Sequence, residues 1–165
     1  MSSVQNTTNK ILNKKNFINL VKLLVMVLIV LGVNRGVQSY LGEAAYDSTG
    51  LGNLSYNAAL EQAKSSNRLV LADMSAIWCP TCRKLDKEVL SNSKVQEVIN
   101  QNYVFTRIEY ESDEGEAFMQ RYDVNGFPTL LVLNQVGDKL VQLPLTFDPE
   151  KFKDLLNQAT NQFNK

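Results

Sequence analysis

The two cysteines of this 165-residue chain lie in the segment Trp78-Cys79-Pro80-Thr81-Cys82, and the sequence has no others. The segment follows a short apolar run, Leu69–Ala72, which predicts a buried strand, and it precedes a helix expected to continue to about Leu90. This pattern predicts a fold in which a strand ends beside the N-terminus of a helix, with the two thiols at that junction. A small secreted protein held together by several disulfides is excluded, because one C-x-x-C provides no framework.

A C-x-x-C at the start of a helix supports thiol chemistry. Cys79 would lie where unpaired N–H groups and the helix dipole favour negative charge, which raises the fraction of the reactive thiolate. Cys82, one turn later, would resolve a mixed disulfide, and we expect it to be the more buried of the two. Pro80 suits the first helical turn because it lacks an N–H that the helix would not use there. The pair is therefore the predicted redox centre.

Other uses of two cysteines fit this sequence less well. The chain has no histidine, which removes histidine-ligated metals and imidazole bases and leaves a zinc site only if two chains share it. Covalent haem attachment needs C-x-x-C-H, and Arg83 stands at the histidine position. A structural disulfide within one helical turn would constrain almost nothing. We therefore expect no metal and no organic cofactor.

From Ser55 onward the hydrophobic pattern alternates between helices and strands. Helices are expected at 55–66, 79–90, 93–100, 112–122 and 148–163, and strands at 68–75, 103–110, 129–133 and 139–143. This alternation predicts an α/β domain with a central sheet over residues 55–165. The 130 residues after Arg35 carry 12 basic and 17 acidic side chains, so the body offers no basic face for nucleic acid.

The first 54 residues predict three further segments. Residues 1–16 are polar and expected to be disordered, whereas residues 17–37 are apolar and long enough for a membrane-spanning helix, which needs about 20 residues. Residues 38–54 are expected to be a flexible linker, because the stretch 34–54 holds four of the eight glycines.

The charge pattern orients the apolar segment. Residues 1–35 carry five basic side chains and no acid, so the positive-inside rule places the N-terminus in the cytoplasm and the body outside it. A cleavable signal peptide fits the same pattern, with small-residue cleavage sites at Val37-Gln38-Ser39 or Glu43-Ala44-Ala45. A buried core helix is the third alternative, and it suits this run less well, because the run is apolar all round and lies outside the domain.

Two motifs resemble a known family. Trp78-Cys79-Pro80-Thr81-Cys82-Arg83-Lys84 resembles the W-C-x-x-C-[KR] signature of the thioredoxin superfamily, and Gly126-Phe127-Pro128-Thr129 resembles its G-[IVF]-P-T loop. Within the superfamily, the stretches 56–64 and 89–96 most resemble the C-terminal periplasmic thioredoxin-like domain of the disulfide interchange protein DsbD. The resemblance covers about residues 55–160. It implies a thioredoxin fold, a central mixed β-sheet flanked by helices, after an N-terminal transmembrane helix.

The resemblance also implies roles for individual residues. Pro128 is expected to be cis and to face the cysteines, with Phe127, Pro128 and Thr129 binding a substrate segment as an added strand. Trp78 is expected to cover the site. Asp73, six residues before Cys79, matches a buried carboxylate that accepts a proton from the resolving thiol. Pro80-Thr81 replaces the Gly-Pro of ordinary thioredoxins, and this dipeptide influences the redox potential.

The sequence therefore predicts an extracytoplasmic, membrane-tethered thiol–disulfide oxidoreductase that reduces disulfides of exported proteins. It would be a monomer in the inner membrane with a periplasmic domain, or a periplasmic protein if cleaved. The electron-conducting membrane domain of DsbD has no counterpart here, so a separate membrane or soluble electron donor is expected. The alternatives are a disulfide oxidase or isomerase, and a non-catalytic binding or assembly module of the same fold.

Overall fold

The chain divides into two compact units, with the boundary between Val37 and Gln38. The computed structural model describes residues 14–52 and 54–163. Helix α1 (Lys14–Asp47) begins in the first unit and ends in the second. The disordered N-terminus predicted for residues 1–16 lies outside the described residues, except for 14–16, which belong to α1.

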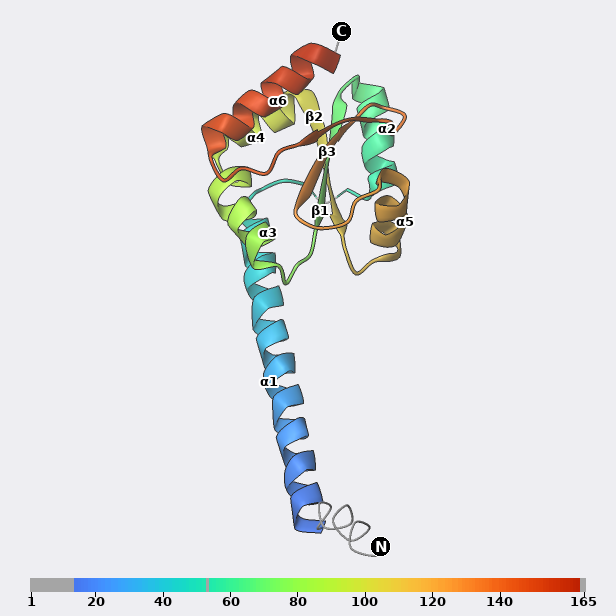
Figure 1. Cartoon of the computed structure of the whole chain (residues 1–165). Helices are drawn as coiled ribbons and strands as arrows, with labels where there is room; N and C mark the ends of the chain where they lie inside the picture. Colours follow the sequence, from blue (N-terminus) through green and yellow to red (C-terminus); the bar gives the residue numbers. More distant parts are fainter. Residues whose placement is uncertain (1–13, 53, 164–165) are drawn as a thin grey trace, which may run out of the picture. The chain divides into compact units, whose positions relative to one another are not determined.

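The second unit is built on a mixed sheet of four strands in the order β2-β1-β3-β4. Strand β1 (Leu69–Ser75) pairs in parallel with β2 (Tyr103–Glu109) and antiparallel with β3 (Thr129–Leu133). Strand β4 (Lys139–Leu143) pairs antiparallel with β3 at the edge. Figure 1 shows helices on both faces of the sheet, α3, α4 and α6 on one side and α2 and α5 on the other. The predicted fold class, a central mixed sheet flanked by helices, is confirmed.

The helices begin where polar side chains cap them. The Ser55 hydroxyl accepts the Ala58 N–H at the start of α2, and the Ser112 hydroxyl accepts the Gly115 N–H at the start of α5. The helix that follows the cysteines reaches Leu90 as predicted, but its last turn is a π-helix. The bounds are α2 Tyr56–Ser66, α3 Pro80–Leu85, the π-helical turn η2 Asp86–Leu90, α4 Ser93–Asn102, α5 Asp113–Tyr122 and α6 Pro149–Phe163.

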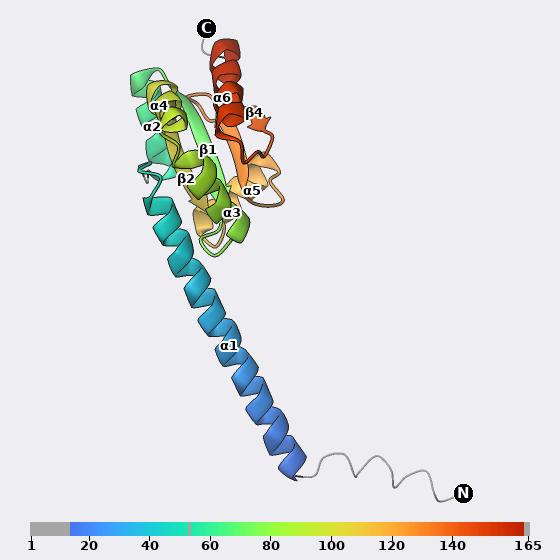
Figure 2. The ribbon, with the colours of Figure 1, turned by 90° about the vertical axis from the view of Figure 1, so that its left-hand side faces the viewer.

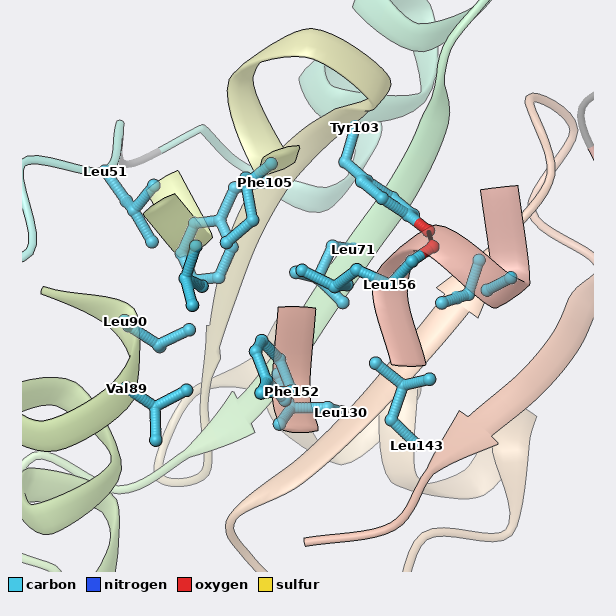
Figure 3. Packing of buried hydrophobic residues seen from close by; sticks show 14 of the residues in the cluster. Leu51, Leu71, Val89, Leu90, Tyr103, Phe105, Leu130, Leu143, Phe152 and Leu156 are labelled. Atoms are coloured by element: carbon cyan, nitrogen blue, oxygen red, sulfur yellow. Dashed lines mark hydrogen bonds between the residues drawn. The ribbon is translucent and has the colours of Figure 1, made fainter. Parts of the chain in front are cut away.

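Side chains of β1 alternate between two hydrophobic clusters, one on each face of the sheet. Leu71 packs with Phe152 and Leu156 of α6, and Figure 3 shows these side chains together. Val70 and Met74 pack on the opposite face with residues of α2 and α5. Asp73 is an odd-numbered residue of the same strand, so its side chain lies on the Leu71 face, which α3, α4 and α6 cover. Figure 2 looks onto the face of the sheet that α3, α4 and α6 cover.

Residues 38–52 differ from the flexible linker predicted for 38–54. Helix α1 continues to Asp47, Ala45 and Thr49 are fully buried, and Leu51 joins the cluster around Leu71. In Figure 3 Leu51 lies beside Phe105. Glycine content suggested flexibility, but the apolar side chains between the glycines pack on the domain. The compact second unit therefore begins at Gln38 rather than at residue 55.

Gly42 of α1 is required for close packing. A Cβ atom at this position would lie 1.7 Å from the carbonyl oxygen of Ile77, in the loop before Cys79. We expect Gly42→Ala to destabilise the unit by about 2 kcal/mol, because helix and loop must separate to admit the methyl group. Urea unfolding followed by the fluorescence of Trp78, the single tryptophan of the chain, measures the change.

The matched control is Gly36→Ala in the same helix, where a Cβ atom would meet no atom within 4 Å. This change should leave the unfolding midpoint unchanged or raise it slightly, because alanine is the better helix former. Equal midpoints for the two variants would contradict the assigned packing of Gly42 against Ile77.

Candidate active site

The cysteine pair lies at the start of α3, where β1 has ended. Cys79 is the N-cap residue and Pro80 occupies the first turn, as predicted. The backbone N–H of Cys82 donates to Cys79 Sγ at 3.1 Å, and both residues are thiols. Cys82 is 2% exposed and Cys79 is 5% exposed, so the expected order of burial is confirmed and both residues are buried.

The environment of Cys82 opposes its ionisation. Burial and a hydrogen bond with Cys79 raise the pKa of the Cys82 thiol to about 12, against a smaller opposing effect of the Ser75 hydroxyl. At neutral pH this thiol is therefore protonated, and it needs a base before it can act as a nucleophile.

A buried ion-pair network lies on the face of the sheet that α3, α4 and α6 cover. Arg107 of β2 donates to Asp73 Oδ2 from Nε at 3.0 Å and from Nη2 at 2.6 Å. Its Nη1 donates to Asp86 Oδ2 at 3.0 Å, and Nη2 also contacts Asp86 Oδ1. The side chains of Arg107, Asp73 and Asp86 are 8%, 0% and 3% exposed, so one guanidinium serves two buried carboxylates.

The network holds two carboxyl groups and one guanidinium, so ionisation of both carboxyls would leave one negative charge uncompensated in the interior. Burial, partly offset by Arg107, raises the pKa of Asp73 above its ordinary value. Among the described residues, none donates a hydrogen bond to Asp73 Oδ1, which is buried. A proton taken up at this oxygen would neutralise the charge, so Asp73 has the properties of a proton acceptor. The expectation that Asp73 is buried is confirmed.

Aromatic side chains border the cysteines. Trp78 and Phe127 pack against the small cluster formed by Ala76 and the two cysteines, with the Trp78 and Phe127 ring centroids 5.5 Å apart. The Tyr110 ring centroid lies 4.9 Å from that of Phe127. The Phe127–Pro128 peptide bond is cis, as expected, and the predicted loop residues Phe127, Pro128 and Thr129 are all half-buried. The structure thus brings the loop and the cysteines together.

The loop before Cys79 is held by an acidic side chain. Both carboxylate oxygens of Glu109, at the end of β2, accept the backbone N–H of Ile77, at 3.2 and 3.1 Å. Burial raises the pKa of Glu109, while the hydrogen bond from Ile77 opposes this effect. Glu109 therefore positions the backbone two residues before Cys79.

Sequence reasoning missed Arg107, Asp86 and Glu109. A signal existed for Arg107, because period-two alternation places it on the same face as Phe105, which is buried. Asp86 lies four residues after Cys82 and so on the same side of the helix. No local pattern indicates that Glu109 reaches a loop thirty-two residues away.

Comparisons with known proteins agree with this geometry. A family model described as Thioredoxin-like matches residues 52–135. The thiol:disulfide interchange protein DsbD of Haemophilus influenzae is 29% identical over 80 residues, which cover 47% of this chain and 14% of that protein. A UBX domain-containing protein 7 homolog of Dictyostelium discoideum is 28% identical over 107 residues, 63% of this chain and 21% of that protein.

The structural comparison gives the same result. The solution structure of a thioredoxin from Thermus thermophilus superposes with a TM-score of 0.59 at 26% identity, covering 66% of this chain and 86% of that one. This chain spans only 14–24% of the length of the curated relatives that it matches. The resemblance to thioredoxins inferred from the two motifs, and that to DsbD inferred from the stretches 56–64 and 89–96, are confirmed. Because the family model covers just over half of the chain, the protein belongs to the thioredoxin-like family.

Proposed function

We propose that this protein is a thiol–disulfide oxidoreductase whose reactive pair is Cys79 and Cys82. The observation that carries the proposal is the hydrogen bond from the Cys82 N–H to Cys79 Sγ at the N-cap of α3. The N-cap position of Cys79 and the donor beside its sulfur are the reasons that Cys79 is proposed as the attacking residue. Cys82 is then the resolving residue, one turn further along.

The reaction proceeds in two displacements. The Cys79 thiolate attacks one sulfur of a substrate disulfide, which forms a mixed disulfide and releases the other sulfur as a thiolate. Cys82 then gives its proton to Asp73 and attacks Cys79 Sγ, so that the bond to the substrate breaks and a Cys79–Cys82 disulfide forms. The substrate has gained two electrons and leaves as its dithiol once both thiolates are protonated. A separate dithiol donor must reduce the Cys79–Cys82 disulfide before the next cycle.

Trp78 and the loop Phe127–Thr129 are proposed to hold the substrate. Phe127 packs against the cysteines, Thr129 is the first residue of β3, and all three residues are half-buried. An extended peptide could pair with the backbone before Pro128 and place its disulfide at Cys79. Protein disulfides rather than small disulfides are therefore the proposed substrates.

We further propose that the domain acts outside the cytoplasm on exported proteins, in the reductive direction. Residues 16–47 of α1 form a helix that is long and apolar enough to cross a membrane, with mean hydropathy 2.4 in its most apolar window. The whole helix has 34 residues, more than the roughly 20 that a span needs, so residues 17–37 suffice as an anchor. The likeness to DsbD is the support for the reductive direction. A reduction potential near about −270 mV would support it, and one near about −120 mV would indicate an oxidase.

Trapping tests the exchange chemistry. Cys82→Ala is expected to accumulate mixed disulfides through Cys79 and to reduce turnover of a disulfide substrate such as insulin by about a hundredfold or more, because the second displacement is lost. Non-reducing gels and mass spectrometry of the adducts measure the trapping. The double variant Cys79→Ser, Cys82→Ser is the matched control and should trap nothing.

A non-catalytic binding module is the second candidate. The 5% exposure of Cys79 favours it, since an attacking sulfur must be reached by the substrate. If the double serine variant restores full function to cells that lack the protein, the binding module is correct and the oxidoreductase is not.

A further inference from the structure

The last turns of α1 contact the buried ion-pair network directly. The Tyr46 ring lies over the Arg107 guanidinium, with 4.1 Å between the ring centroid and Cζ. The Tyr46 hydroxyl donates to the Gly52 carbonyl oxygen at 3.1 Å, and the side chain packs against the cluster around Leu71. Tyr46 is therefore fixed at both its ring and its hydroxyl.

The geometry of Arg107 explains what this ring does. A guanidinium donates its hydrogen bonds in its own plane, and those of Arg107 go to Asp73 and Asp86. The flat face of the guanidinium cannot donate hydrogen bonds. An aromatic ring packs favourably against that face through a cation–π interaction. Because Arg107 is only 8% exposed, the ring of Tyr46 separates the network from water on that side.

We propose that Tyr46 is a positioning residue for the exchange reaction, because its ring keeps water from the Arg107–Asp73–Asp86 network and so maintains Asp73 as the acceptor of the Cys82 proton. The inference rests on the proposed function, in which Asp73 has that role. It extends the active site to the end of α1, outside residues 52–135 that the family model matches.

The direction of the effect follows from the groups around Asp73. Arg107 and Glu109 face it from β2, Asp86 from η2 and Tyr46 from α1. Arg107 is the one cation among these four, and burial is the largest influence that raises the pKa of Asp73. Water admitted by loss of the ring stabilises the carboxylate, so the pKa falls and Asp73 becomes a weaker base.

Three substitutions at Tyr46 in the full chain test this inference. Tyr46→Ala is expected to lower the titration midpoint of Asp73 by about one pH unit and to slow resolution of the mixed disulfide about tenfold. Tyr46→Phe keeps the ring and should match the parent in both. Tyr46→Leu covers the guanidinium only in part, so it should lower the Asp73 midpoint by less than Tyr46→Ala does. It replaces the alanine variant if that variant does not fold. Carboxyl ¹³C NMR, assigned with Asp73→Asn, measures the titration.

Leu51→Ala is the matched control, because Leu51 anchors the same segment in the hydrophobic cluster around Leu71. It should lower stability and leave the Asp73 midpoint unchanged. An unchanged or raised midpoint in folded Tyr46→Ala or Tyr46→Leu overturns the inference, since a rise would mean that the ring held Arg107 in place rather than excluding water. The NMR titration needs no substrate, so it is decided independently of the trapping experiment that tests the proposed function.

Discussion

A protein that begins at Ser55 is expected to be unfolded or severely destabilised, whereas one that begins at Gln38 should fold cooperatively. The shorter protein lacks the buried residues Ala45, Thr49 and Leu51. Burying a leucine side chain contributes about 2 kcal/mol, and the ring over Arg107 about 1 kcal/mol more. Removing the segment also exposes the apolar surface of its neighbours, so the expected loss is at least about 4 kcal/mol, a large part of the stability of a small domain.

Urea unfolding of the two proteins, followed by far-UV circular dichroism, measures this difference. The result is not obvious from family boundaries, because the matched region starts at residue 52 and would suggest a domain that begins there. Leu51→Ala in the longer protein should account for roughly half of the loss, since a buried leucine-to-alanine change costs about 2–3 kcal/mol. Equal stability of the two proteins would show that residues 38–54 are the flexible linker predicted from their glycine content.

Most of the fold could be predicted because its signals are local. Ser55 and Ser112 cap helices where the hydrophobic period changes, and both caps are present. The strand that ends before Cys79 and the strand that starts at Thr129 are short apolar runs between polar turns. The C-x-x-C and the Gly-Phe-Pro-Thr loop are contiguous motifs, so each carries its own information about the site.

The remainder could not be predicted because it depends on packing between distant residues. Glycines indicate flexibility when their neighbours are solvated, but Gly42 lies in a helix and permits close approach to Ile77. Tyr46 is an ordinary aromatic residue until the fold places Arg107 beneath it. Asp73 was predicted as an isolated buried carboxylate. Its sharing of one guanidinium with Asp86 arises only when β1, β2 and η2 come together.

Arg107→Met is expected to lower the free energy of unfolding by about 3–5 kcal/mol near neutral pH, because it leaves two buried carboxylates without a cation. Loss of the guanidinium raises the pKa of Asp73 further above its unfolded value. The folded state then holds a proton that the unfolded state has released, so stability is greatest in acid and is lost as the pH rises through the folded pKa. Urea unfolding measures the free energy of unfolding of the parent and of Arg107→Met at about pH 4.5 and about pH 7.5. The difference between the two proteins should be smaller at the lower pH.

A triple variant separates charge from packing. Arg107→Met combined with Asp73→Asn and Asp86→Asn removes the whole network while conserving most of its volume, so it should recover most of the stability and lose the pH dependence. The network would then be retained for the proton that Asp73 accepts rather than for stability, and the triple variant should resolve mixed disulfides slowly although it is well folded. The opposite result is a loss in the free energy of unfolding of Arg107→Met that does not depend on pH and that the triple variant does not recover. It would mean that the arginine stem contributes by packing alone. In that case Asp73 carries no uncompensated charge, and the physical basis for its role as proton acceptor is lost.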